Sequence, residues 1–330
     1  MNKFPKTNVP RTNYTTFYVN TLLQYFRRLP YTRQKRAIMN RAPFAYFGGK
    51  YRLLDHLQNY IPPLRSIDCY VEPFFGSGTL FFSRERLGQV EVINDYSSYI
   101  YNFFRVLRDK NEALIKRLKY TPYSKETFLE ARAYLANGKN AVTKSHLNIP
   151  TREQVYAAWC VYLIYSMSIF SNGRNFSRGK DKSKAIEFKE NQARLDYCVG
   201  RLQNATIENE DALDTVKRYD SPRTFVYLDP PYLNVKNPIS MKKAYHGNDG
   251  NELHERLLDW CLSARSMIMI SNYQNDLYDE KLKNWNREEI SVKLMTLSGR
   301  NKPGLVRDST EIIWTSPNVP VKKQMDLFNG

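Results

Sequence analysis

A short apolar run, residues 224–228, ends in the tetrapeptide Asp229-Pro230-Pro231-Tyr232. The run has the length and the β-branched and aromatic content of a buried strand, and the two prolines prevent that strand from continuing. The sequence therefore predicts a strand that closes in a rigid turn, with a carboxylate and an aromatic ring at its carboxyl end.

This turn has the groups needed to hold a planar amine. The Asp229 carboxylate can accept one hydrogen from an exocyclic NH2 group, and the Pro230 carbonyl can accept the other. Pro231 has no backbone N–H, so it adds no competing donor, and its ring stiffens the turn. Tyr232 can stack on the face of a base. An ordinary proline turn would have the same sequence, so the tetrapeptide alone does not decide between the two interpretations.

A glycine turn, Gly76-Ser77-Gly78, follows a predicted strand over residues 66–71 and precedes a predicted helix over 79–87. Such a turn lets the backbone approach a ligand closely. The third glycine of the dinucleotide fingerprint is missing and no phosphate loop is present, so neither NAD nor ATP is supported. A second predicted strand, residues 90–93, ends in Asn94-Asp95, where an acid is well placed to accept both hydroxyls of a ribose.

A third motif, Gly48-Gly49-Lys50, precedes a helical pattern with Leu53, Leu54 and Leu57 on one face. Taken alone, it is best interpreted as a glycine turn followed by a solvated lysine.

In this order the motifs resemble the Dam-like, D12 class (alpha group) of DNA adenine-N6 methyltransferases, which use S-adenosyl-L-methionine. The resemblance covers roughly residues 43–316, whereas the first 40 or so residues have no counterpart in the class. It is carried by residues 46–50, 71–79, 94–95, 229–232 and 270–273, and more loosely by 171–179.

The resemblance implies roles for individual residues. Four catalytic residues are implied, namely Asp229, Pro230, Pro231 and Tyr232. The residues implied to bind S-adenosyl-L-methionine are Tyr46, Gly48, Gly49, Lys50, Glu72, Pro73, Phe74, Gly76, Gly78, Thr79, Asn94, Asp95, Asp211 and Asp229. The residues implied to contact double-stranded DNA are Asn172, Gly173, Arg174, Asn175, Arg178 and Lys180. For Asp211 the alternative role is a helix N-cap.

Strands alternate with helices along most of the chain, which predicts a mostly parallel sheet with helices on both faces. With the resemblance, this is a Rossmann-like α/β methyltransferase fold with an inserted, mainly helical target-recognition subdomain. The further elements predicted are helices over 16–28, 155–169, 187–202 and 252–263, and strands over 205–208, 267–270 and 311–314. The expected divisions are a basic extension (1–42), a cofactor-binding catalytic domain (43–110 and 191–316), the recognition subdomain (111–190) and a tail (317–330).

A polar, basic segment, residues 171–184, follows the apolar helix predicted over 155–169. No core could absorb its charge, and Gly173 and Gly179 allow it to bend. It is either a flexible surface loop or, as the resemblance implies, a loop that reads a DNA groove.

Composition is compatible with a polyanionic partner, because the formal net charge is +17 and the pI is near 9.6. Many basic proteins never contact DNA, so charge alone does not decide the function. The four cysteines are far apart and the four histidines lack metal-ligand spacing, so reduced thiols and no bound metal are expected. No run is long and apolar enough to span a membrane and the first residues are too polar for a secretory signal, so a cytosolic protein is expected.

The expected reaction is methyl transfer from S-adenosyl-L-methionine to N6 of an adenine that is flipped out of the duplex. A direct displacement needs no cysteine nucleophile, unlike methylation of cytosine C5. The alternatives are an RNA or cytosine-N4 methyltransferase, or a DNA-binding relative without catalytic activity. The recognised DNA sequence, the oligomeric state, and the choice among restriction-modification, phage and housekeeping roles stay open.

Overall fold

The structure is a computed structural model that describes residues 42–46, 48–137, 149–179, 183–232, 250–295 and 306–320. The helix predicted over 16–28 lies outside these residues, as do Phe47 and Lys180.

A seven-stranded sheet in the order β3-β2-β1-β4-β5-β7-β6 forms the centre of the molecule. The first five strands in this order are parallel, whereas β7 runs antiparallel to β5 and β6 antiparallel to β7. The strands are β1 (Cys69–Glu72), β2 (Val90–Asn94), β3 (Ala205–Glu208), β4 (Thr224–Leu228), β5 (Met267–Tyr273), β6 (Asn286–Met295) and β7 (Val306–Thr315). The predicted Rossmann-like, mostly parallel sheet is confirmed.

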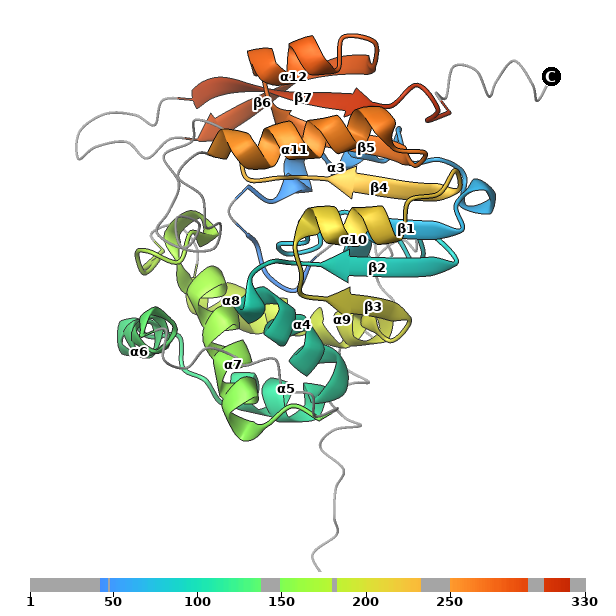
Figure 1. Ribbon diagram of the computed structural model, residues 1–330. Helices are drawn as coiled ribbons and strands as arrows, with labels where there is room; N and C mark the ends of the chain where they lie inside the picture. The colour runs from blue at the N-terminus through green and yellow to red at the C-terminus, as the bar shows by residue number, and fades with distance from the viewer. Residues whose placement is uncertain are drawn as a thin grey trace, which may run out of the picture.

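The order of strands reverses between β1 and β4. From β1 the chain moves outward through β2 to β3, and then returns to β4 on the other side of β1. Connections leaving the carboxyl ends of β1 and β4 therefore diverge, which leaves a crevice in which open α/β sheets bind their ligands. The parallel strands point to the left in Figure 1, so that side is the carboxyl edge.

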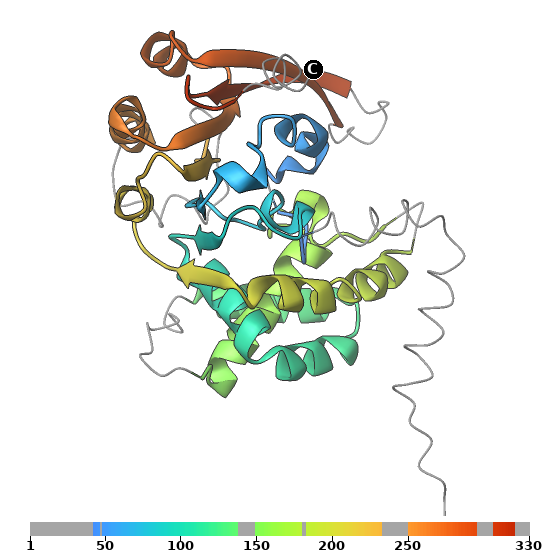
Figure 2. The same ribbon diagram turned by 90° about the vertical axis from the view of Figure 1, so that its right-hand side faces the viewer.

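Helices cover both faces of the sheet (Figures 1 and 2). Helices α10 (Ala212–Arg218), α11 (Gly250–Ser263) and α12 (Asp276–Lys281) lie on one face, against a cluster that includes Val71, Val226 and Ile268. The other elements are the 3-10 turns η1 (Lys50–Arg52), η2 (Leu64–Ser66), η3 (Phe81–Ser83) and η4 (Ile169–Ser171), and α3 (Leu54–Leu57), α4 (Ser98–Asp109), α5 (Asn111–Lys119), α6 (Lys125–Ala136), α7 (Arg152–Met167), α8 (Lys184–Gln192) and α9 (Leu195–Leu202).

Helix α7 is the centre of a helical layer that lies beyond β3 (Figure 1). It begins at a capping box, in which the Thr151 hydroxyl accepts the Gln154 backbone N–H and the Gln154 side chain accepts the Thr151 N–H. Most of its side chains are buried among α4, α5, α6 and α8, because it is apolar nearly all round. The predicted buried helix is confirmed.

Two local predictions are wrong, and one strand was not predicted. The helix expected over 79–87 is only the 3-10 turn Phe81–Ser83, because both phenylalanines are drawn into the core and Arg84 is already extended. The helix expected over 187–202 is divided at Ala193 and Arg194 into α8 and α9. Strand β6 was not predicted, because its first half contains the charged run Arg287-Glu288-Glu289, which lacks the alternation of a strand.

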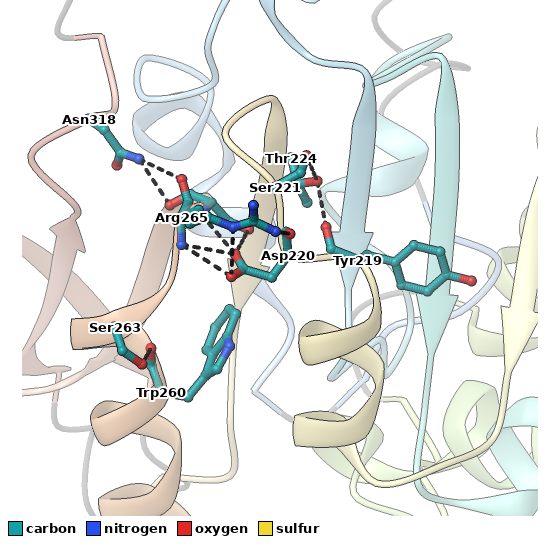
Figure 3. Close-up of polar contacts among 9 residues, drawn as sticks. Tyr219, Asp220, Ser221, Thr224, Trp260, Ser263, Arg265 and Asn318 are labelled. Atoms are coloured by element: carbon teal, nitrogen blue, oxygen red, sulfur yellow. Dashed lines mark hydrogen bonds and ion pairs between the residues drawn. The ribbon is translucent and has the colours of Figure 1, made fainter.

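The amino ends of β4 and β5 are tied together by Asp220 (Figure 3). Its carboxylate accepts hydrogen bonds from the backbone N–H of Arg265 and from the N–H and hydroxyl of Ser266, at 2.6–3.3 Å. The Asn318 amide donates to the carbonyls of the same two residues at 3.1 Å. This connection fixes the sheet at the end opposite to the site described next.

Candidate active site at the carboxyl edge of the sheet

The glycine turn after β1 has a backbone that requires glycine. Gly76 and Gly78 have φ of +52° and +69°, and a Cβ on Gly78 would lie 2.3 Å from the Phe75 ring. The Gly76 N–H donates to Asp95 Oδ2 at 2.8 Å, and the Ser97 N–H donates to Asp95 Oδ1 at 2.8 Å. Asp95, just after β2, therefore holds the glycine turn against the neighbouring strand.

Asp95 still has acceptor capacity, because each carboxylate oxygen can accept more than one hydrogen bond. Burial raises the pKa of Asp95 to about 6, and its two backbone hydrogen bonds partly oppose the rise. The ribose contact predicted for this acid stays a prediction.

Asn94 joins two loops and is itself almost fully buried. Its Nδ2 donates to the carbonyls of Pro73 and Glu210, and its Oδ1 accepts the Glu210 N–H. Its amide is thus engaged within the protein, and it joins the loop after β1 to the loop after β3. Asp211 caps α10 by accepting the Leu213 N–H at 2.8 Å, which is the alternative role considered for it.

Lys50 is buried and points at the Asp-Pro-Pro-Tyr turn. Its Nζ lies 2.7 Å from Asp229 Oδ1, donates to the Gly48 carbonyl at 2.8 Å, and lies 4.6 Å from the centre of the Tyr232 ring. A tight turn, in which the Gly49 N–H donates to the Tyr46 carbonyl, leads into this position. The interpretation of Lys50 as a solvated lysine is therefore wrong.

Asp229 lies at the carboxyl end of β4, a strand that is buried throughout. Its Oδ1 also accepts the Ser271 hydroxyl at 3.3 Å. Burial raises the pKa of Asp229, and the Lys50 ammonium opposes that rise.

The Tyr232 ring is held by side chains from β5 and β7. Its hydroxyl donates to Glu311 Oε2 at 2.9 Å, and its ring meets Tyr273 edge-on with centroids 4.5 Å apart. Sequence reasoning missed Glu311 as a site residue, because only the pairing of Tyr273 with Glu311 between β5 and β7 brings it here. Burial raises the pKa of Glu311.

Glu72 ends β1 beneath the glycine turn and accepts the Tyr70 hydroxyl at 2.7 Å. Burial raises its pKa to about 8. Of the other residues expected near the cofactor, Phe74 packs in the core under α10 and α11, and the Thr79 hydroxyl lies 3.3 Å from that of Ser77.

The basic segment after α7 is more ordered than a simple flexible loop. Ser168 and Phe176 form an antiparallel bridge, and the Gly173 N–H donates to the Ser168 hydroxyl at 2.9 Å. The segment lies on the carboxyl side of the sheet (Figure 1). Three of the residues predicted to contact DNA have exposed side chains, namely Arg174, Asn175 and Arg178.

Two further findings concern only the residues that the structure describes. No group of three histidine, cysteine, aspartate or glutamate side chains in this part of the chain could hold a metal ion. None of the helices that the structure describes is long and apolar enough to cross a membrane.

A mostly parallel sheet with a glycine turn, an acid after the next strand and an Asp-Pro-Pro-Tyr turn around its switch point is typical of an α/β enzyme that binds its ligand at the carboxyl edge of the sheet. The profile of the D12 class N6 adenine-specific DNA methyltransferase family matches residues 46–296. The chain belongs to this family, as the motifs predicted.

Several proteins named as methyltransferases or methylases are similar to this chain. The Type II methyltransferase M1.LlaDCHI of Lactococcus lactis subsp. cremoris is 27% identical over 308 residues, which are 86% of this chain and 98% of the relative. The DNA adenine methylase of Escherichia coli strain K12 is 27% identical over 251 residues, covering 73% of this chain and 84% of the relative. The DNA adenine methylase of Serratia marcescens is 26% identical over 253 residues, covering 72% and 85%.

Proposed function

We propose that this chain transfers a methyl group from S-adenosyl-L-methionine to N6 of an adenine flipped out of double-stranded DNA. The observation that carries the proposal is the meeting of Lys50, Asp229 and Tyr232 at the carboxyl end of β4, beside the glycine turn that follows β1. Membership of the D12 class family supports adenine in DNA as the substrate.

The pocket suits a cationic cofactor without phosphate groups. The glycine turn has no third glycine and no lysine-containing phosphate loop, so it does not favour a pyrophosphate. Three acids border it, because Glu72, Asp95 and Asp229 end or follow β1, β2 and β4. A positive charge placed among buried carboxyl groups stabilises their ionised forms, and a sulfonium carries such a charge.

In this proposal Asp95 accepts the ribose hydroxyls, and the backbone of Gly76 and Gly78 forms one wall of the pocket. Tyr46 lies against this wall, because a Cβ on Gly76 would be 3.1 Å from the Tyr46 ring. The other residues proposed to surround the cofactor are those that the family resemblance implies for cofactor binding. Among them, Asn94 and Asp211 hold the loops that border the cofactor.

The electrophilic methyl group comes from S-adenosyl-L-methionine. Asp229 and the Pro230 carbonyl accept the two N6 hydrogens, which keeps the nitrogen lone pair directed at the methyl carbon. Lys50 Nζ, 2.7 Å from Asp229 Oδ1, favours the ionised form of this carboxylate, and Tyr232 stacks on the base. Rate enhancement then comes mainly from positioning and electrostatics.

The helical layer with its basic loop is proposed to be the target-recognition subdomain, residues 111–190. It projects from the sheet beyond β3, and the loop after α7 lies on the carboxyl side where the adenine would enter (Figure 1). Exposed Arg174 and Arg178 give this loop positive charge.

The experiment that tests the proposal compares wild type with Asp229→Asn on duplex DNA of mixed sequence, using methyl-labelled S-adenosyl-L-methionine and nucleoside analysis. Asp229→Asn places an NH2 group opposite the substrate's NH2 group, so methyl transfer should fall by about 10² to 10⁴-fold. Binding of DNA should change little, since phosphate contacts dominate it.

The matched control is Asp196→Asn, the same change at an exposed position of α9, which should keep full activity. Label in N4-methylcytosine, label in RNA alone, or near-normal turnover of Asp229→Asn would contradict the proposal.

A further inference from the structure

A buried histidine outside the predicted site contacts the catalytic turn. His254 lies in the first turns of α11 and is 2% exposed. Its Nε2 lies 2.9 Å from the Pro231 carbonyl oxygen, and its Nδ1 lies 2.6 Å from the hydroxyl of Tyr278 on α12. Two helices on one face of the sheet are thus connected to the Asp-Pro-Pro-Tyr turn through one imidazole ring.

The partners of this ring determine its protonation. A carbonyl oxygen only accepts hydrogen bonds, so the Nε2 atom of His254 must carry a hydrogen to bond to Pro231. In a neutral imidazole the other nitrogen is then an acceptor, and the Tyr278 hydroxyl donates to it. Burial lowers the pKa of His254 to about 4 and raises the pKa of Tyr278, so both groups keep these roles at neutral pH.

The covalent chemistry of the turn shows why this contact matters. The proline rings fix φ at Pro230 and Pro231. A residue that precedes proline is restricted to extended ψ, which limits Asp229 and Pro230. Because peptide bonds are planar, the ψ angle of Pro231 is the one soft dihedral between Pro230 and Tyr232.

The ψ angle of Pro231 also sets the direction of its carbonyl. A donor that holds the Pro231 carbonyl therefore fixes the backbone position of Tyr232 relative to the two acceptors on Asp229 and Pro230, while Glu311 and Tyr273 orient its ring. His254 is that donor in the described part of the chain.

We propose that His254 is a positioning residue for methyl transfer: its Nε2–H holds the Pro231 carbonyl, and Tyr278 keeps the ring in the tautomer that can do so. The inference rests on the proposed function of the Asp-Pro-Pro-Tyr turn and adds a residue to it. His254 does not touch the substrate. Replacing it should therefore lower kcat and leave the affinity for the cofactor and for DNA nearly unchanged.

The test uses two conservative replacements that separate the ring nitrogens. The amide nitrogen of His254→Gln reaches the position of Nε2, whereas that of His254→Asn reaches only the position of Nδ1. We expect His254→Gln to keep kcat within about threefold of wild type, and His254→Asn to lose about 10 to 100-fold, as a misplaced catalytic group does. Equal kcat for His254→Asn and wild type, at temperatures where both are folded, would overturn the inference.

Nitrogen-15 NMR of the ring tests the inference even if both variants fold poorly. The chain has four histidines, so the wild-type His254 signals can be assigned by comparison with Tyr278→Phe, which removes one hydroxyl. In wild type we expect a neutral His254 ring that is protonated at Nε2. In Tyr278→Phe we expect a mixture of the two tautomers and a kcat about three to tenfold lower than that of wild type. A wild-type ring protonated at Nδ1 would refute the proposed hydrogen bond.

These outcomes are distinct from failure of the proposed function. A wild-type protein that makes no N6-methyladenine contradicts the function whatever the tautomer of His254 is. An active wild type with an equally active His254→Asn variant contradicts only the role of His254.

Discussion

At the scale of single residues, the site concentrates carboxyl groups around one ammonium group. Asp229 and Glu311 both lie in the electrostatic field of Lys50, and burial raises the pKa of each acid. Keeping both carboxylates ionised in this buried region is unfavourable without a ligand, because the single Lys50 ammonium must offset two negative charges at a low dielectric constant. A cation bound beside them would lower both pKa values, which agrees with a sulfonium cofactor.

Glu72 gives a pH dependence whose sign can be predicted. Its pKa is about 8 in the folded protein against an ordinary value of 4.5, so between these values the folded state holds a proton that the unfolded state releases. The free energy of unfolding should therefore fall as pH rises from about 5 to 8, by up to about 1.4 kcal/mol per pH unit. Glu72→Gln keeps an acceptor for the Tyr70 hydroxyl and should remove this slope.

The measurement is urea unfolding of the cofactor-free protein at several pH values from 6.5 to 8. Asp95, with its pKa of about 6, and His254, with an ordinary pKa of 6.5 and a folded pKa of about 4, add the same slope to both proteins near pH 6.5. The difference in slope between wild type and Glu72→Gln therefore reports Glu72 alone. The same slope in wild type and Glu72→Gln would show that Glu72 is ionised in the folded state.

At the scale of elements, the segment after α7 has a specific backbone conformation that hydrogen bonds hold. Phe170 and Ser171 have φ of +55° and +51°, which is unusual for residues with side chains. Hydrogen bonds from the Ile169 N–H to the Asn175 carbonyl and from the Ser177 N–H to the Met167 carbonyl hold this conformation. The Arg132 guanidinium also donates to the Arg174 carbonyl at 2.6 Å, so α6 supports the turn from the side.

The two exposed arginines of this turn, Arg174 and Arg178, can contact DNA in two ways, and these ways predict different effects of mutation. If Arg178 meets a phosphate, Arg178→Ala should weaken binding to all sequences alike and reduce the salt dependence by a slope of about 1. If Arg174 reads a guanine edge, Arg174→Ala should cost about 1–3 kcal/mol on the preferred site and little elsewhere.

Both variants are measured by methylation of preferred and single-mismatch duplexes at two salt concentrations. Lys217→Ala is the control, because it removes one exposed charge near the end of α10, toward the amino end of β4. If neither arginine variant differs from Lys217→Ala, the loop has no role in binding DNA.

At the scale of the whole molecule, the carboxyl and amino ends of the parallel strands have different functions. The carboxyl edge carries the polar residues of the site, whereas Asp220 at the amino edge accepts three donors from Arg265 and Ser266 (Figure 3). These hydrogen bonds hold β4 and β5 in register at the edge of the sheet opposite the proposed active site, so they take no part in the reaction.

Asp220→Ala should therefore lower the free energy of unfolding by about 1–3 kcal/mol, since it leaves donors unpaired. Asp220→Asn keeps one carbonyl acceptor and should lose less. Urea denaturation gives the stability, and kcat of the folded variants should equal that of wild type. A large loss of kcat in folded Asp220→Ala would mean that the two edges are coupled.

The sequence by itself determined the class of fold and the local turns. Strand β4 is a short, mostly apolar and fully buried run that is followed by Asp229 and two prolines, so its existence and its end can be predicted from composition and turn residues. Gly76 and Gly78 have the positive φ expected of a turn that only glycine adopts easily. The ordered motifs were sufficient to identify the family.

The tertiary structure decided which residues meet. Glu311 and His254 lie 79 and 23 residues from their partners in the turn, and only sheet pairing and the packing of α11 bring them there. Taken alone, the Gly-Gly-Lys motif indicated a solvated lysine, because a lysine after a glycine turn has no local reason to be buried, whereas the resemblance placed Lys50 near the cofactor. The Asp229 carboxylate provides the reason for its burial. Local sequence fixes backbone preferences, whereas burial and the pairing of distant charges depend on the whole fold, and these decide the chemistry of the site.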